Sequence, residues 1–318
     1  MSMTVSAQKN ILKFNADKKF KIVQFTDLHI KHLDPRSDIA FTRMNEVLDL
    51  EKPDLVVFTG DLIYSSPAAD NLKKVLKVAA DRHIPFAVTF GNHDHEQGLS
   101  NDELFKIISA TPYNVTIDEV STISGVGNCA LALKDSQGKK DVAVLYCFDS
   151  NQYSTIPEAK GYDYIKSDQI KWYQQRSEQF THANGDIALP SLAFFHIPLQ
   201  EFNQAATNEN ASLYGIRREK ACSSYLNSGL FKVMKKQADV MGIFVGHDHD
   251  NDYAVNWQGI LLAYGRFTGG PTEYTHIPNG ARVIELTENS RAFKTWIRLA
   301  NKEIQQSTIF PNNYIKNK

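Results

Sequence analysis

The sequence predicts an α/β protein folded as one continuous domain. In the first third of the chain, short apolar runs alternate with segments of helical periodicity, the order typical of a parallel sheet. Most of the second half consists of short strand-like segments. The composition is that of a globular protein, because 42% of the 318 residues are hydrophobic and 22% are charged. No repeat, low-complexity tract or long linker divides the sequence.

The N-terminal third follows a β-α-β-α-β order. Three apolar segments are predicted to be strands: Lys21–Thr26 (KIVQFT), Asp54–Thr59 (DLVVFT) and Ile84–Phe90. A helix over Arg36–Leu50 follows the first strand and ends before Pro53. A second helix is expected over Asn71–Arg82. Near-continuous apolar strands in this order indicate a parallel sheet that is covered on both faces.

The second half is expected to be richer in strands. A polar turn at Gln137–Lys139 separates two strand candidates, Asn128–Lys134 and Asp141–Phe148, which predicts a hairpin. Helices are expected over Ser167–His182 and Ser223–Gln237. The remaining strand candidates are Ser191–His196, Val240–Val245, Tyr253–Asn256, Ile260–Tyr264, Ala281–Leu286 and Ala292–Leu299. We take residues 21–300 as the domain, with an extension and edge segment at 1–20 and a tail at 301–318.

Charge and hydropathy exclude several classes of partner. Lys and Arg number 35 against 36 Asp and Glu, and this balance argues against a nucleic acid or an anionic membrane as the main partner. No apolar stretch approaches the roughly 18 residues that span a bilayer. The three cysteines (Cys129, Cys147 and Cys222) are expected to be buried thiols rather than a disulfide framework. Val5–Ala7 has the small-residue pattern of a signal-peptidase site, but no apolar segment precedes it. We therefore favour a cytoplasmic protein and keep export as the alternative.

Residues that can bind metals follow the carboxyl ends of five predicted strands. They occur in DLH (residues 27–29), GD (60–61), GNHDH (91–95), the single His196, and GHDH (246–249). Ligands of open α/β sheets bind outside the carboxyl ends of the strands, so these residues stand where a site is expected.

The spacing within these motifs suits metal binding. Residues two apart in an extended chain point the same way, which would let Asp27 and His29 face one metal. The glycines before the candidate ligands allow sharp turns and close approach. Imidazole and carboxylate groups suit Zn, Mn and Fe. Two metals with four protein ligands each and one shared carboxylate need seven residues, and the motifs supply Asp27, His29, Asp61, Asn92, His196, His247 and His249. A pair of metals about 3.5–4 Å apart is the usual arrangement for phosphoryl displacement.

The ordered series DLH, GD, GNHD, a lone His and GHDH resembles the calcineurin-like metallophosphoesterase superfamily. The resemblance runs from Asp27 to His249, and the stretches FFHIPLQEF, NSGLF, VGHDHDNDY and LAYGRFTGG are similar to its small, single-domain, purple-acid-phosphatase-like branch. It implies a four-layer α/β/β/α sandwich of two mixed sheets flanked by helices. It also implies two divalent or trivalent metal ions (Mn, Fe or Zn) and a small phosphoester substrate.

The resemblance implies a role for each motif residue. Asp27, His29 and His249 would hold the first metal, Asn92, His196 and His247 the second, and Asp61 would bridge them. A metal-bridging hydroxide would be the nucleophile. His93 would act as general acid toward the leaving alkoxide, and Asp94 would orient its ring.

The sequence departs from purple acid phosphatases at the first motif. Tyr64 stands where those enzymes carry the tyrosinate that ligates ferric iron, but this chain also has His29, which those enzymes lack. We expect His29 to be the ligand, Tyr64 to line the site or pack, and the protein to be colourless. The segment 60–66 also lacks the Arg-containing extension of the protein serine/threonine phosphatases.

Tyr64 and two other residues near the motifs are candidates for substrate binding. Arg266 could contact the substrate phosphate, with a surface salt bridge as the alternative. His95 is expected to support the ligands through hydrogen bonds and is a second candidate contact.

Three functions fit these residues. A dinuclear phosphomonoesterase is favoured, and a phosphodiesterase of cyclic nucleotides or other diesters is the alternative enzyme. A non-catalytic metal-binding scaffold is the alternative of another class, although His93 and all seven ligands are present.

Overall fold

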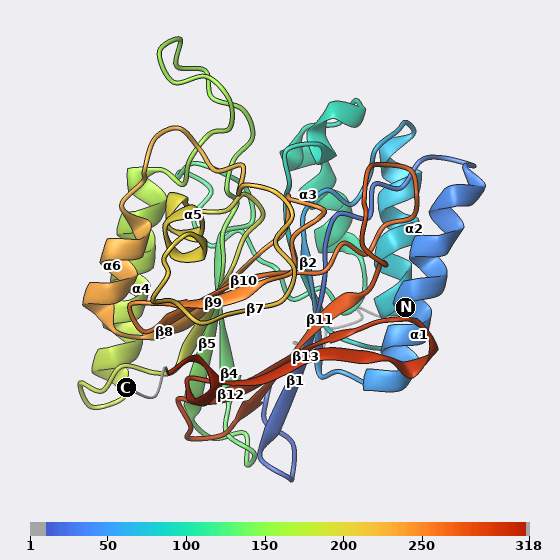
Figure 1. Cartoon of the computed structure of the whole chain (residues 1–318). Helices are drawn as coiled ribbons and strands as arrows, with labels where there is room; N and C mark the ends of the chain where they lie inside the picture. The colour runs from blue at the N-terminus through green and yellow to red at the C-terminus, as the bar shows by residue number, and fades with distance from the viewer. Residues whose placement is uncertain (1–10, 316–318) are drawn as a thin grey trace, which may run out of the picture.

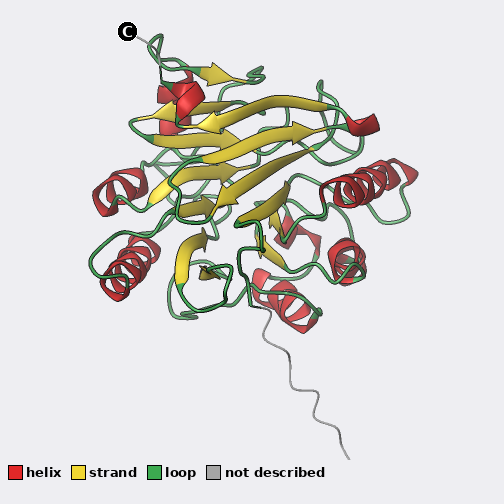
Figure 2. Cartoon of the chain, turned by 90° about the horizontal axis from the view of Figure 1, so that it is seen from below, coloured by secondary structure: helices red, strands yellow, loops and turns green. Residues whose placement is uncertain are grey.

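Two β-sheets packed face to face form the centre of the molecule, as a computed structural model of the chain shows for residues 11–315. Helices cover the outer face of each sheet, giving the four-layer α/β/β/α sandwich that the resemblance implied (Figures 1 and 2). The layers follow from the strand pattern. In β2 (Leu55–Thr59), Val56 and Phe58 pack toward the helices, whereas Leu55 and Val57 pack toward the other sheet.

The first sheet has six strands in the order β13-β12-β11-β1-β2-β3. Its parallel part joins β1, β2 and β3, and β11 pairs antiparallel with β1. The strand bounds are β1 Lys19–Phe25, β3 Phe86–Thr89, β11 Ala281–Thr287, β12 Phe293–Arg298 and β13 Ile304–Phe310. The predicted parallel sheet is therefore present, but its second face is covered by another sheet rather than by helices.

The second sheet has seven strands in the order β4-β5-β6-β8-β10-β9-β7. Strands β5, β6, β8 and β10 run parallel, and β4 and β5 form the predicted hairpin. The bounds are β4 Cys129–Lys134, β5 Asp141–Cys147, β6 Ser191–Phe194, β7 Leu213–Tyr214, β8 Val240–Val245, β9 Ala254–Trp257 and β10 Ile260–Tyr264.

Six α-helices form the two outer layers of the described chain. On the first sheet lie α1 (Asp38–Glu51), α2 (Ala68–Ala80) and α3 (Asn101–Ala110). On the second lie α4 (Ser167–Ala183), α5 (Gln200–Ala206) and α6 (Leu230–Gln237). Single 3₁₀ turns cover Pro35–Ser37, Asp94–Gln97, Ala300–Lys302 and Asn312–Tyr314.

The structure differs from the sequence prediction at several places, and the short strand β7 is one of them. Helices α3 and α5 were not predicted, although a Ser100–Glu103 capping box marks the start of α3. The helix expected over Ser223–Gln237 begins only at Leu230, after Gly229 in a left-handed conformation. The segment expected to be a tail at 301–318 contains β13, which pairs with β12.

The cysteine prediction is right for two of the three thiols. Cys129 and Cys147 are buried, free and opposite each other in the β4–β5 pair. Cys222 is exposed, because it lies in the irregular segment before α6 rather than in a strand. Within residues 11–315, none of the helices is long and apolar enough to cross a membrane. The Val5–Ala7 pattern lies outside the described residues.

Candidate metal centre

The five predicted motifs meet at one edge of the sandwich. The DLH, GD and GNHD motifs directly follow the ends of β1, β2 and β3, and His196 and the GHDH motif follow β6 and β8 of the other sheet. Because these strands run parallel within their sheets, their carboxyl ends lie on the same side. Side chains more than 200 residues apart in sequence, such as Asp27 and His249, therefore become neighbours.

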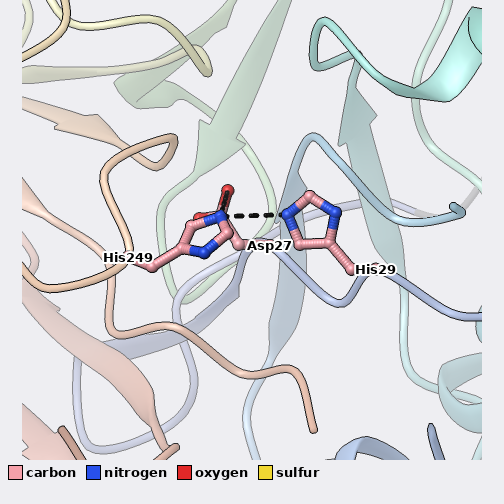
Figure 3. A group of neighbouring side chains, drawn as sticks. All are labelled: Asp27, His29 and His249. Atoms are coloured by element: carbon pink, nitrogen blue, oxygen red, sulfur yellow. Dashed lines mark hydrogen bonds and ion pairs between the residues drawn. The ribbon is translucent and has the colours of Figure 1, made fainter. Parts of the chain in front are cut away.

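One group of potential ligands consists of Asp27, His29 and His249, all buried. Figure 3 shows the two imidazoles converging beside the carboxylate. Nε2 of His29 lies 3.0 Å from Nε2 of His249, which in turn lies 3.7 Å from Oδ1 of Asp27. Two ring nitrogens so close together need a shared proton or a shared cation.

The other group consists of Asp61, His196 and His247, again all buried. Nε2 of His196 lies 3.1 Å from Oδ2 of Asp61 and 3.3 Å from Nδ1 of His247. The predicted ligand Asn92 is also fully buried. Its amide nitrogen donates to the Tyr153 hydroxyl, but its oxygen has no hydrogen-bond partner among the described residues, as expected of an atom left for a cation.

Asp61 lies between the two groups. Its Oδ2 atom is 3.1 Å from Nε2 of His196 and 3.8 Å from Nε2 of His29, so one carboxylate oxygen faces an imidazole of each group. The other oxygen accepts a hydrogen bond from the backbone N–H of His93. The Asp61 carboxylate is therefore placed so that both groups lie within 4 Å of it.

The backbone at these strand ends is unusual. Asp27, His29 and Asp61 have φ values of 54°, 45° and 53°, in the left-handed region that non-glycine residues rarely adopt. Asp27 and His29 therefore converge through a left-handed turn and not through the extended chain that the sequence argument assumed. A Cβ atom at Gly91 would lie 2.2 Å from Oδ1 of Asp61, so only glycine fits there.

Hydrogen bonds to the backbone fix the orientation of two candidate ligands. Nδ1 of His196 faces the Thr59 carbonyl oxygen at 2.7 Å, and Nδ1 of His249 faces the Tyr274 carbonyl oxygen at 2.8 Å. The Tyr274 ring also stacks on His249. Donation from Nδ1 would leave Nε2 of each imidazole free as an acceptor, the usual arrangement around metal-binding histidines.

Burial and neighbouring charges set the protonation of the ligands. Burial and the nearby His249 hold the pKa of His29 well below its usual range, and burial and His196 do the same for His247. Burial by itself would raise the pKa of Asp61, but His196, through its charge and hydrogen bond, together with His29, keeps that pKa well below normal. Burial by itself would lower the pKa of His196, but the charge and hydrogen bond of Asp61 raise that pKa to about 10. Neutral imidazoles and ionised carboxylates are the forms that bind metals, so a metal ion at this group would displace the proton of His196.

His93 lies beside the ligands with its ring partly exposed. Its Nδ1 atom is 2.6 Å from a carboxylate oxygen of Glu96. Asp94, predicted to orient this ring, instead accepts hydrogen bonds from the backbone N–H groups of Asp61, Leu62, Ile63 and Gly91. Asp94 is buried and points back under the GD turn, so the orienting role falls to Glu96.

The three candidate substrate contacts lie in three different surroundings. Tyr64 packs edge-on against both His29 and His93, with ring centroids 5.0 and 4.9 Å apart, and so lines the site as predicted. Arg266 is fully buried in an ion pair with Asp252 and donates to the Pro278 carbonyl, which rules out a surface role and removes it from the substrate. His95 is half-buried in the 3₁₀ turn, and its shielded Nδ1 has no partner within residues 11–315.

Sequence reasoning missed several residues around the centre. Tyr153 and Tyr162 come from the loop between β5 and α4, and Tyr274 comes from the loop after β10. Tyr162 stands perpendicular to His247 with ring centroids 4.3 Å apart. Glu96 directly follows the GNHDH motif, so the sequence offered a signal for it. The three tyrosines occur in irregular segments, and their spacing gives no such signal.

The sandwich places two buried groups of potential metal ligands side by side, the arrangement of a candidate dinuclear metal centre. The donor set fits metal ions, because imidazoles, carboxylates and an unbonded amide oxygen converge on the same edge. The family model described as "Calcineurin-like phosphoesterase" matches residues 20–251. The chain belongs to this family.

Curated relatives carry both active and inactive names. A protein named "Probable inactive purple acid phosphatase 29" from Arabidopsis thaliana is 32% identical and covers 97% of this chain and 90% of its own length. "Phosphatase DCR2" from Saccharomyces cerevisiae is 34% identical over 88% of this chain and 54% of its own length. Among solved structures, a dimetal phosphatase from Danio rerio matches with a TM-score of 0.62 and 12% identity, covering 91% of this chain and 99% of that one. The structural match supports the fold.

Proposed function

We propose that the protein is a dinuclear metal-dependent phosphomonoesterase. The observation that carries this proposal is the complete donor set: two buried triads, with Asp61 of the second facing His29 of the first, and the buried Asn92 oxygen free of any hydrogen bond to the described residues. Asp27, His29 and His249 would hold one ion, Asn92, His196 and His247 the other, and Asp61 both. Metal ions bound there would supply an activated water and stabilise charge on the phosphoryl group.

The other residues of the site suit proton transfer to the leaving group. His93 is the partly exposed imidazole next to the buried ligands, and the Glu96 carboxylate at 2.6 Å holds its Nδ1 side. The Nε2 atom remains available to donate a proton to a leaving alkoxide. Tyr64 packs on one side of His93 and limits the orientations that its ring can adopt.

The names of some relatives include the word inactive, so the scaffold alternative needs a direct test. A chain that had lost hydrolysis would have no need to keep His93, which is not among the metal-binding groups, beside a full set of ligands. The presence of both therefore supports an enzyme.

The test uses purified full-length chain loaded in turn with Mn, Zn or Fe. We expect hydrolysis of p-nitrophenyl phosphate to exceed that of bis-p-nitrophenyl phosphate. Asp61→Asn or Asn92→Ala should lose bound metal together with activity. His93→Ala should keep the metal and lose roughly 10²–10⁴-fold in rate, the contribution of one general acid. Faster diester hydrolysis would replace the monoesterase with a diesterase, and no hydrolysis with any metal would favour the scaffold.

A further inference from the structure

A cleft opens beside the second ligand group, between the loop after β5 and the segment that precedes α6. We call it the side cleft; the residues that form its two walls include Lys160 and Tyr162 on one side and Lys220, Cys222, Ser223 and Tyr225 on the other. Its volume of about 580 Å³ falls within the roughly 300–1,000 Å³ of small-molecule sites. None of the metal ligands lines it, so it is a separate feature of the molecule.

Both walls of the side cleft connect directly to the metal-binding loop. On one wall, the Tyr162 ring stands perpendicular to His247, with 4.3 Å between their centroids. On the other, the backbone N–H of Cys222 donates to the carboxylate of Asp248, the residue between His247 and His249. A substrate with its phosphate at the metals would therefore have this cleft next to it.

The loop that carries Lys160 and Tyr162 is internally braced. Backbone hydrogen bonds join Ser154 N–H to the Gly161 carbonyl at 2.8 Å and Asp163 N–H to the Gln152 carbonyl at 3.0 Å. Tyr153 stacks on Tyr162 at 5.7 Å and also accepts a hydrogen bond from Asn92. The loop projects from the edge of the sandwich where the metal-binding motifs lie (Figure 1). The wall of the cleft is thus fixed relative to a predicted metal ligand.

The charged residues that line the side cleft have one sign, and the carboxylates of Asp248 and Glu219 lie behind its Cys222 wall. Of the described residues that line it, only Lys160 and Lys220 are charged, and both are exposed. Neither ammonium forms an ion pair with a carboxylate within residues 11–315. The amides of Gln200 and Asn203 are already bonded to backbone groups of Tyr225 and Ala221. The two ammonium groups are therefore the charged groups left to meet a ligand, beside the neutral side chains of Gln204, Ser223 and Tyr225, and they favour an anion.

We propose that the side cleft binds a second anionic group of the substrate, so that the preferred substrates are phosphomonoesters whose alcohol carries a further phosphate or carboxylate. The proposal rests on the proposed function of the metal centre. Lys160 and Lys220 would hold the second anion, while the Tyr162 ring would pack against the carbon chain that links it to the scissile phosphate.

The test compares substrates that differ only in the second anion. The full chain, loaded with its activating metal, is assayed with butyl phosphate, butane-1,4-diol bisphosphate and hexane-1,6-diol bisphosphate. We expect a lower KM for at least one bisphosphate than for butyl phosphate. In Lys160→Ala/Lys220→Ala, KM for that bisphosphate should rise roughly 3- to 30-fold more than KM for butyl phosphate, as expected of two solvent-screened charge contacts.

A matched control removes two lysines elsewhere in the same layer. Lys232 and Lys236 lie exposed on α6 and do not line the side cleft. Lys232→Ala/Lys236→Ala should leave the ratio of the two KM values as in the unchanged protein. If the control and the cleft variant change this ratio equally, or if neither changes it, the proposal is wrong.

A change at Cys222, the exposed cysteine of the three, tests whether the second anion binds inside the side cleft. A bulky side chain at this position, Cys222→Phe, should raise KM for the bisphosphate more than KM for butyl phosphate, and Cys222→Ser should not. An equal effect on both substrates would contradict the proposal. If the unchanged protein hydrolyses none of the esters, the proposed function fails separately. The cleft is then tested by calorimetry of butane-1,4-diol bisphosphate with metal-loaded protein, where equal affinity of the unchanged and double-variant proteins overturns it.

Discussion

His93 and its acidic neighbours show how single residues divide the work of the site. Glu96 contacts the His93 ring, whereas Asp94 binds four backbone N–H groups and has its pKa raised to about 7 by burial and by the nearby charge of Asp61. The two carboxylates are two residues apart in sequence, yet one faces the substrate side and the other supports the GD turn.

We predict that Glu96→Ala lowers kcat roughly tenfold with little change in bound metal, because His93 loses its orienting partner. The loss should grow for esters with poor leaving groups, which depend most on a proton donor. A series of aryl phosphates of rising leaving-group pKa measures this, and Glu96→Gln should restore part of the rate. Equal losses across the series would show that Glu96 acts only on structure.

Arg266 gives a second prediction for a single residue. Its guanidinium is fully buried against Asp252, whose carboxylate also accepts from Gln306 and from the backbone of Ile216. We expect Arg266→Met to lower the free energy of unfolding by about 3–5 kcal/mol, because Asp252 would remain as a buried charge that has lost its partner. Urea unfolding measures this, with the exposed Arg217→Met as control. A stable variant with a raised KM would instead support a substrate contact.

The ligands could be predicted from sequence, whereas their surroundings could not. Asp27, His29 and the others stand in short motifs directly after apolar strands, so the sheet fixes their neighbourhood. Arg266 also follows an apolar strand, but its side chain turns away from the site toward Asp252. The direction in which a side chain such as Arg266 points depends on which buried charge needs a partner. The spacing of residues in the sequence does not encode that.

At the scale of elements, the buried strands were predictable and the irregular or half-exposed elements were not. Strands β2, β3 and β8 are buried along their whole length between helices and the opposite sheet, and their runs of apolar residues show this. Strand β13 is a mostly exposed edge strand whose sequence, IQQSTIF, is largely polar, so it reads as a tail. Helix α5 has only seven residues, too few for a clear period.

The turn after β3 yields a prediction at this scale. Gly91 lets the chain pass within contact distance of Asp61, and a Cβ there would lie 2.2 Å from that carboxylate. We expect Gly91→Ala to displace Asp61 and to weaken metal binding at least tenfold, because a ligand's position would change. Elemental analysis after dialysis measures this. Gly98→Ala is the control in the same turn region, because it strains the backbone at φ +91° but its Cβ would meet no atom within 4 Å and displace no ligand. Unchanged metal content in Gly91→Ala would contradict the bridging assignment.

The edge strand β13 yields a second prediction at the scale of elements. Phe310 and Tyr314 are buried in the core between the sheets, and Tyr314 also bonds Thr308. A chain that ends at residue 303 loses these contacts, and we expect it to lose at least about 3 kcal/mol of stability. Thermal unfolding compares it with a chain that ends at residue 315. Equal melting temperatures would show that β13 is as dispensable as a tail.

At the scale of the whole molecule, the candidate ligands come from both sheets. Asp27 and Asp61 follow strands of the first sheet, whereas His196, His247 and His249 follow strands of the second. Each triad combines residues from the two sheets. Bound ions would therefore join the layers of the sandwich, in addition to the apolar core between them.

Metal binding should consequently stabilise the whole fold and not only the site. Ions that bind only the folded chain add about 2.7 kcal/mol when present at 100 times their Kd. We expect chelation to lower the melting temperature by several degrees, and added metal to restore it with two equivalents per chain. Asp61→Asn, which lacks the shared carboxylate charge, should lose most of this metal-dependent shift, whereas His93→Ala should keep it while losing activity. A melting temperature that does not respond to metal would mean that the two sheets hold together without ions, and that the buried triads do not bind them.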